Sequence, residues 1–106
     1  MNVDGKVNAS GGFFQTSDLN KKNVLSELDL NKAYELIDKC QTILYTLKGS
    51  DDVQIGLIAQ EVQEIFPELV TVTADGSLAL DYSRLTVVIL RVLKDLIVRM
   101  QNLESK

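Results

Sequence analysis

Apolar residues recur at intervals of three and four through much of the first half of the chain, which is the spacing of an amphipathic helix. The pattern predicts a helix over residues 31–42, with Asp29 or Asn31 as its N-cap. A short strand is expected to follow at residues 43–47, before a polar turn that contains glycine. This region therefore predicts a helix that leads directly into a strand.

The middle of the chain carries the signals of two further strands and a short helix. Residues 53–58 (VQIGLI) predict a strand, and residues 59–65 (AQEVQEI) predict a helix of one or two turns that ends before Pro67. β-Branched residues alternate in 68–73 (ELVTVT), and the chain returns at 78–80 after an Asp-Gly turn. These segments predict a β-hairpin behind the short helix.

The last segment, residues 81–106, predicts one long helix with a regular apolar seam. The seam consists of Ile89, Leu93, Leu96, Met100 and Leu103. Gaps of four, three, four and three give the 3.5-residue period of helices that pack side by side. Val88, Val92 and Ile97 widen the stripe, so we expect the first half of the helix to pack on the domain and the second half to meet partner helices. The stretch contains charged residues and falls short of the ~20 apolar residues of a membrane span.

Residues 1–16 differ from the rest of the chain because they are rich in glycine, asparagine and serine. Their few apolar residues predict short strands and turns, as at the end of a longer β-rich segment. We therefore divide the chain into the end of a β-rich stalk, residues 1–16, and a small domain, residues 17–106. The predicted fold class is α+β, with a small helix and hairpin domain and a coiled-coil-like C-terminal helix over residues 82–104.

Composition and charge narrow the function classes. The 106 residues are 45% hydrophobic and 25% charged, which is typical of one soluble domain, and the first ten lack the apolar stretch of a signal peptide. The net charge of −4 argues against nucleic-acid binding. The chain has no histidine and a single cysteine, Cys40, which excludes a Cys/His zinc site, a Ser-His-Asp triad and an internal disulfide. We expect neither a metal nor a cofactor.

One local cluster has residues that could carry chemistry: residues 16–23 (TSDLNKKN), where a serine precedes two lysines. A serine near a lysine can form a nucleophile and base pair. However, Ser-Asp is also a common start of a turn, and most lysines are solvated. Taken alone, the cluster favours a structural role. Glu61 and Glu64, one helical turn apart, are equally ordinary.

The order of the segments is more specific than any one of them. Ser17-Asp18, with lysines close behind, precedes the amphipathic helix; IGLIAQEVQEIFPELV follows at residues 55–70, and LDYSRL at 80–85 precedes the last helix. This order resembles the C-terminal intramolecular chaperone domain, a self-cleaving peptidase, of phage tail spikes, tail fibres and neck appendages, which also occurs in the myelin regulatory factors of animals. The resemblance spans about Thr16 to Leu103, and the glycine-rich residues before it resemble the last coils of a phage β-stalk.

The resemblance implies a homotrimer whose domain promotes folding of the β-stalk upstream in the same polypeptide and then cuts itself off. It implies Ser17 as the nucleophile and Lys22, five residues later, as the base, with the cleavage site at Thr16, Ser17 and Asp18. Ring geometry favours the bond between Thr16 and Ser17, because attack on the Thr16 carbonyl passes through a five-membered ring. The bond between Ser17 and Asp18 is the alternative.

The resemblance also implies a setting and supporting residues. Gln60 and Glu61 would either orient the cleavage loop or hydrogen-bond the fold together. The domain would act in the host cytoplasm during virion assembly and be released from the mature virion, with no nucleic-acid or membrane partner. The long C-terminal helices would form a trimeric helical bundle.

The serine-lysine motif departs from the usual pattern of the family, Ser-Asp-x-x-Leu-Lys-x-Asn. Lys21 stands in place of the leucine, and Asn23 comes one residue early, so Lys21 is an alternative base. On a continuous helix, a four-residue spacing would place Lys21 on the Ser17 face and turn Lys22 away. Lys22 can act only if residues 17–22 form a turn or loop, which a scissile bond requires in any case, and we favour it.

Serine-lysine chemistry suits a chain without histidine. A lysine has a pKa of about 10.4 in water and must lose its proton to act as a base. Burial at a trimer interface disfavours the ammonium form, so assembly would switch the peptidase on. The altered motif leaves a second function open, a trimerisation and folding module that does not cleave and stays attached to its stalk.

Overall fold

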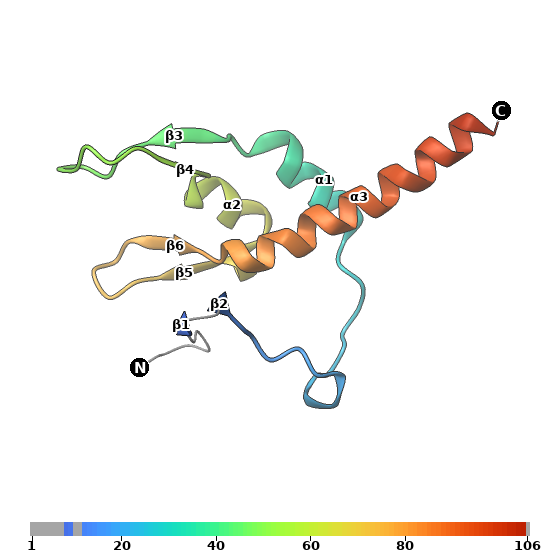
Figure 1. Cartoon of the computed structure of the whole chain (residues 1–106), viewed down its shortest axis with the longest axis horizontal. Coiled ribbons are helices and arrows are strands. Elements are labelled where there is room, and N and C mark those ends of the chain that lie inside the picture. The colour runs from blue at the N-terminus through green and yellow to red at the C-terminus, as the bar shows by residue number, and fades with distance from the viewer. Residues whose placement is uncertain (1–7, 10–11, 106) are drawn as a thin grey trace.

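Three α-helices and three two-stranded antiparallel sheets make up the described part of the chain, residues 8–9 and 12–105 of a computed structural model (Figure 1). The helices are α1 (Leu30–Lys39), α2 (Ala59–Ile65) and α3 (Tyr82–Glu104), with single 3₁₀ turns η1 (Leu19–Lys21) and η2 (Pro67–Leu69). The strands pair as β1 (Asn8–Ala9) with β2 (Gly12–Phe13), β3 (Ile43–Tyr45) with β4 (Gln54–Gly56), and β5 (Val70–Val72) with β6 (Leu78–Leu80). The predicted α+β class is confirmed.

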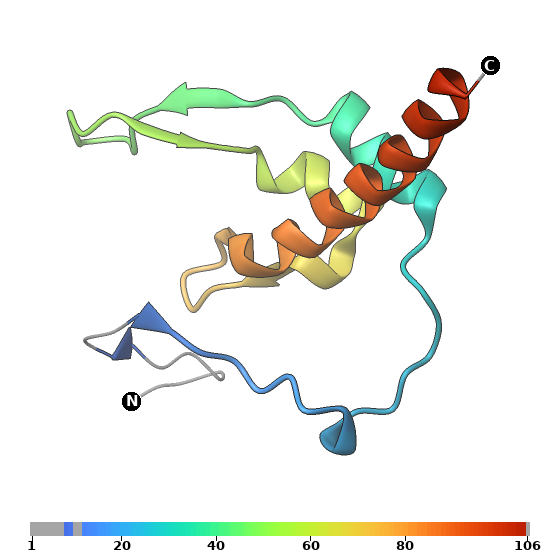
Figure 2. The same ribbon diagram turned by 45° about the vertical axis from the view of Figure 1, so that its right-hand side comes forward.

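The N-terminal segment is described in part. Two short strands, β1 and β2, pair in the register Asn8 to Phe13, as the composition of this segment predicts. Most of the predicted end of the stalk, residues 1–7 and 10–11, lies outside the described residues. After β2 an extended segment passes around one side of the helices before the chain enters α1 (Figure 2).

Helix α1 begins within one residue of its predicted start and ends three residues early. Asp29 is the N-cap, because its carboxylate accepts a hydrogen bond from the Lys32 N–H at 3.1 Å. The helix ends at Lys39 because the Gln41 N–H donates to the Glu61 carboxylate, at 3.0 Å, and not to an intrahelical carbonyl. The Gln41 side-chain amide donates to the same carboxylate at 2.8 Å, and the two bonds, the backbone one first, lower the pKa of Glu61.

Strands β3, β4 and β5 are shorter than the sequence pattern predicts. Strand β6 and helix α2 have their predicted bounds, Leu78–Leu80 and Ala59–Ile65. Strand β4 ends at Gly56 because the next N–H, that of Leu57, donates to the Tyr82 hydroxyl at 2.9 Å. The hairpin begins at Val70 and not at residue 68, because Pro67 starts the 3₁₀ turn η2. The expected Asp-Gly turn joins β5 to β6, with Gly76 at a φ of 89°.

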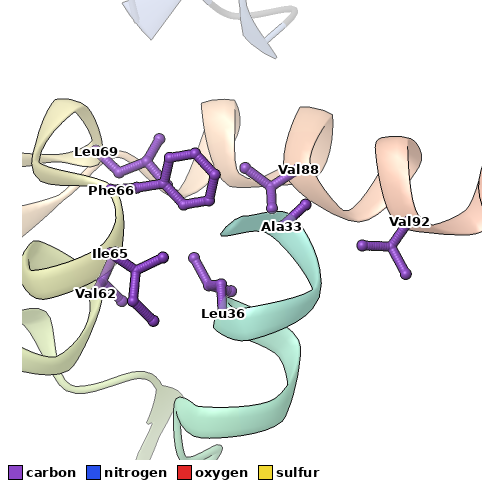
Figure 3. Packing of buried hydrophobic residues seen from close by; sticks show 8 residues of the cluster. All are labelled: Ala33, Leu36, Val62, Ile65, Phe66, Leu69, Val88 and Val92. Carbon is purple, nitrogen blue, oxygen red and sulfur yellow. The ribbon is translucent and has the colours of Figure 1, made fainter. Parts of the chain in front are cut away.

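The buried core is small and is shared by the three helices. Its members are Ala33, Leu36, Val62, Ile65, Phe66, Leu69, Val88 and Val92. Figure 3 shows these side chains converging from α1, from α2 and the residues after it, and from α3. A polar clamp extends the α1–α3 contact, because the Tyr34 hydroxyl donates to the Asp95 carboxylate at 2.6 Å and Arg99 donates to it at 2.7 Å. These two bonds, with Tyr34 the larger cause, lower the pKa of Asp95.

Helix α3 has a buried part and an exposed part. Val88 and Val92 reach the core, as the prediction for the first half of the helix requires. All five members of the predicted seam are exposed, from Leu96 at 39% to Leu103 at 68%. Figure 1 shows the C-terminal part of α3 extending beyond the other elements. The exposed seam is therefore available for contact with other helices.

We expect Val62→Ala to lower the free energy of unfolding by about 2–3 kcal/mol, because Val62 is fully buried and its loss leaves a cavity. The matched control is Val72→Ala, since Val72 is 62% exposed, and it should lower that free energy by less than about 1 kcal/mol. Chemical denaturation of both variants at one protein concentration measures the difference. Equal losses would contradict the placement of the core.

Candidate functional site

A single capped turn brings the predicted nucleophile and base together. Asp18 is extended and its carboxylate accepts a hydrogen bond from the Asn20 N–H at 2.9 Å, which caps η1. The turn closes with hydrogen bonds from the Lys21 N–H to the Asp18 carbonyl and from the Lys22 N–H to the Leu19 carbonyl. Lys22 is extended again, so the chain doubles back after only three helical residues.

The Lys22 ammonium donates a hydrogen bond to the Ser17 hydroxyl, with 2.8 Å between Nζ and Oγ. Residues 17–22 do not form a continuous α-helix, so the condition for a contact across five residues is met. The lysine is the donor in this contact. A role as base would need the opposite direction, in which a neutral amine accepts the hydroxyl proton and leaves an alkoxide as the nucleophile. Both side chains are exposed in the single chain.

A cavity of about 590 Å³ opens beside this pair. Thr16 and Ser17 both line it, so the bond predicted to be cut lies at its edge. Its other lining residues are Gln15, Lys22, Leu28, Phe66, Glu68, Leu69, Ser83, Arg84, Val87 and Val88. Lys21, the alternative base, is not among them. The cavity therefore combines an apolar floor, taken partly from the core, with polar groups at the serine.

Sequence reasoning missed one wall of this cavity, the first two turns of α3. Ser83 and Arg84 contribute to it, although they lie more than sixty residues after Ser17. The signal was present in the motif LDYSRL at residues 80–85, which includes both Ser83 and Arg84. Asp81 caps α3, since its carboxylate accepts a hydrogen bond from the Arg84 N–H at 3.1 Å.

Gln60 and Glu61 are not among the residues that line the cavity. The Glu61 carboxylate binds Gln41, which joins α2 to the end of α1. Within one chain, Glu61 therefore makes hydrogen bonds that hold the fold together, which is the second of the two roles considered for it.

The two sequence motifs of the resemblance meet at Tyr82. Its hydroxyl accepts the Leu57 N–H, and a Cβ atom at Gly56 would lie 2.6 Å from that oxygen. A side chain at residue 56 would therefore displace the Tyr82 hydroxyl, which links the glycine of the first motif to the tyrosine of the second. This contact joins the first residue of α3 to the end of β4.

The sequence model of the peptidase S74 family, described as the chaperone of endosialidase, matches residues 17–71. The match covers slightly more than half of the 106 residues. The chain belongs to this family. The matched segment begins at Ser17 and includes the capped turn, the core residues of α1 and α2, and the first two residues of β5. The family carries a peptidase name and is described as a chaperone. The chain is assigned to this family and to no narrower activity.

The described residues were also considered for metal ligands and for membrane-spanning helices, with the following result. No cluster of three or more histidine, cysteine, aspartate or glutamate side chains in residues 8–9 and 12–105 could hold a metal ion. Within the same residues, no helix is both long enough and apolar enough to cross a membrane.

We expect Tyr82→Phe to lower the free energy of unfolding by about 0.5–1.5 kcal/mol, because it leaves the Leu57 N–H without its acceptor. The matched control is Tyr45→Phe, which removes only an exposed hydroxyl contact with Gln54 at 3.2 Å and should have a smaller effect. Thermal unfolding of both variants tests this. If Tyr45→Phe were the more damaging change, Tyr82 would not be the link between the two motifs.

Proposed function

We propose that the chain is a chaperone domain that assembles as a trimer, promotes folding of a β-rich stalk upstream in the same polypeptide, and then releases itself by serine-lysine autoproteolysis. The observation that carries the proposal is the 2.8 Å contact between the Lys22 amine and the Ser17 hydroxyl. Membership in a chaperone family with a peptidase designation supports it, as does a family match that begins at Ser17.

The chemistry uses one water molecule for each chain. The Ser17 hydroxyl attacks the carbonyl carbon of Thr16 while the neutral Lys22 amine takes the hydroxyl proton. The tetrahedral intermediate collapses with loss of the C–N bond between Thr16 and Ser17. Lys22 returns the proton to the Ser17 nitrogen, which leaves the Thr16 acyl group as an ester on the Ser17 oxygen. Water then hydrolyses this ester to a new C-terminus at Thr16 and a domain that begins at Ser17.

The surface of a single chain supports assembly. The chain exposes 8689 Å², whereas a compact monomer of its mass exposes about 5,900 Å². Its radius of gyration is 16.8 Å, against about 13 Å for a compact domain of this length. The exposed seam of α3 is the apolar surface that partner helices would cover. Packing of three chains would also remove water from the exposed Ser17 and Lys22 side chains, which favours the neutral amine.

The proposed setting follows from the family resemblance. The partners are two further copies of the chain and the stalk that continues from residues 1–16. The stalk would be that of a phage tail spike, tail fibre or neck appendage, folded in the host cytoplasm, with the domain absent from the mature virion. No cofactor is required, because serine, lysine and water complete the reaction.

Ser17→Ala should abolish cleavage when the domain is expressed in its longer polypeptide, because the variant lacks the attacking oxygen. Lys22→Ala should also abolish it, since the variant lacks the base. Lys21→Ala is the matched control and should be cut at nearly the wild-type rate, and the wild-type rate should rise with pH because the neutral lysine is the active form. Intact mass of each chain is the measurement.

The outcomes separate the alternatives. Cleavage of Ser17→Ala would mean that a host protease makes the cut. An inactive Lys21→Ala with an active Lys22→Ala would move the base by one residue. A wild-type trimer that is never cut would favour the second function, a folding module that stays attached to its stalk.

Leu96→Asp should dissociate the trimer, because it would bury a charge in the bundle three times over. Gln101→Asp is the control, since residue 101 lies outside the seam and the trimer should persist. Light scattering at micromolar concentration measures both variants. A monomeric wild-type chain under these conditions would refute assembly through α3.

A further inference from the structure

One face of α3 and the segment that precedes the proposed cut line the same cavity. Ser83 and Val87 are four residues apart, as are Arg84 and Val88, so the two pairs occupy neighbouring rows of one helical face. All four line the cavity that Gln15, Thr16 and Ser17 line from the other side. The first two turns of α3 are thus placed to hold the chain on which Ser17 would act.

The direct contact across the cavity joins Ser83 to Gln15. The Ser83 hydroxyl lies 3.4 Å from the Gln15 side-chain oxygen, to which it can donate. The same hydroxyl donates to the Asp81 carboxylate at 2.7 Å, so the N-cap of α3 holds it in place. A hydroxyl carries one hydrogen, which these two acceptors share. The longer contact is the weaker of the two, so a modest effect on rate is expected from it.

The contact with Ser83 matters because Gln15 lies next to the peptide bond that would be cut. Gln15 is joined directly to Thr16, whose carbonyl carbon the Ser17 oxygen would attack. Autoproteolysis within one chain gains its rate from the geometry in which the attacking oxygen and the carbonyl are held. A tether at Gln15 restricts the rotation of the Thr16 carbonyl relative to Ser17, whereas the contact between Ser17 and Lys22 leaves that rotation free.

We propose that Ser83 is a positioning residue for the self-cleavage reaction, and that it acts by binding the carboxamide of Gln15 and so orients the Thr16 carbonyl for attack. The inference rests on the proposed function and extends it to the recognition of a residue upstream of the cut. It makes the start of α3 part of the cleavage site, although residues 83 and 15 are 68 positions apart.

The test is a double-mutant cycle in the longer polypeptide, with the cleavage rate followed by intact mass. Ser83→Ala and Gln15→Ala should each slow cleavage about threefold to tenfold, the range of one weak hydrogen bond. The double variant should be no slower than the slower single variant, since both changes remove one contact. Ser83→Thr keeps the hydroxyl and should restore the rate to within about twofold of the wild type.

The cycle separates positioning from helix capping. If Ser83→Ala acted only through loss of the Asp81 contact, it would slow cleavage by the same factor in the wild-type chain and in the Gln15→Ala chain. A double variant whose rate loss is the product of the two single losses would therefore overturn the proposal. Unchanged rates in both single variants would overturn it as well, as would failure of Ser83→Thr to rescue. The matched control is Ser105→Ala, a hydroxyl deletion at the far end of α3, which should leave the rate unchanged.

A second measurement does not need cleavage. In the Ser17→Ala chain, backbone ¹⁵N order parameters of residues 15–17 should fall when Ser83→Ala is added, because the tether is lost. They should not fall with Ser105→Ala. If the wild type is never cut, the proposed function fails, while a fall in these order parameters still supports the contact. Order parameters that do not change would overturn the inference even where the wild type cleaves.

Discussion

The packing of α3 against α1 and the residues after α2 is the contact on which the rest of the molecule depends. Val88 and Val92 close a core of eight buried side chains among the described residues, and the Tyr34–Asp95 hydrogen bond adds a polar contact between α1 and α3. The same placement brings Tyr82 to the Leu57 N–H. It also lays the first turns of the helix along one wall of the cavity beside Ser17. One helix thus completes the core, joins the two motifs and borders the candidate site.

The candidate site combines a local part and a distant part that rest on different physics. The local part is the turn capped by Asp18, which needs only backbone hydrogen bonds to bring Lys22 back to Ser17. Local bonds of this kind form without a core, so the pair can exist in a single chain. The distant part is the wall of the cavity, which exists only once α3 has docked. The Ser17–Lys22 pair is formed by local contacts, whereas the cavity beside it needs the docked α3. Cleavage would therefore depend on folding and assembly of the domain.

Much of the local structure was predictable because its causes lie close together in the sequence. Asp29 as an N-cap, Ala59–Ile65 as a helix and the Asp-Gly turn of the hairpin all follow from neighbouring residues. The errors lie at element ends, and two of them come from a partner that is distant in the sequence. The end of α1 moved because Gln41 binds Glu61, and β4 stopped because Leu57 binds Tyr82. No local pattern carries that information.

The sequence by itself determined the α+β class, the order of the elements and the serine-lysine spacing, because propensity, turn residues and apolar periodicity act over a few residues. It also named Ser17 and Lys22, and left the choice between Lys22 and Lys21 to the shape of one turn. That turn is 3₁₀ and is closed by local hydrogen bonds, so that Lys22 reaches the hydroxyl. Only the tertiary structure placed Ser83 beside Gln15. The physical reason is that this contact depends on how α3 docks, and docking is set by a core whose members are scattered along the chain.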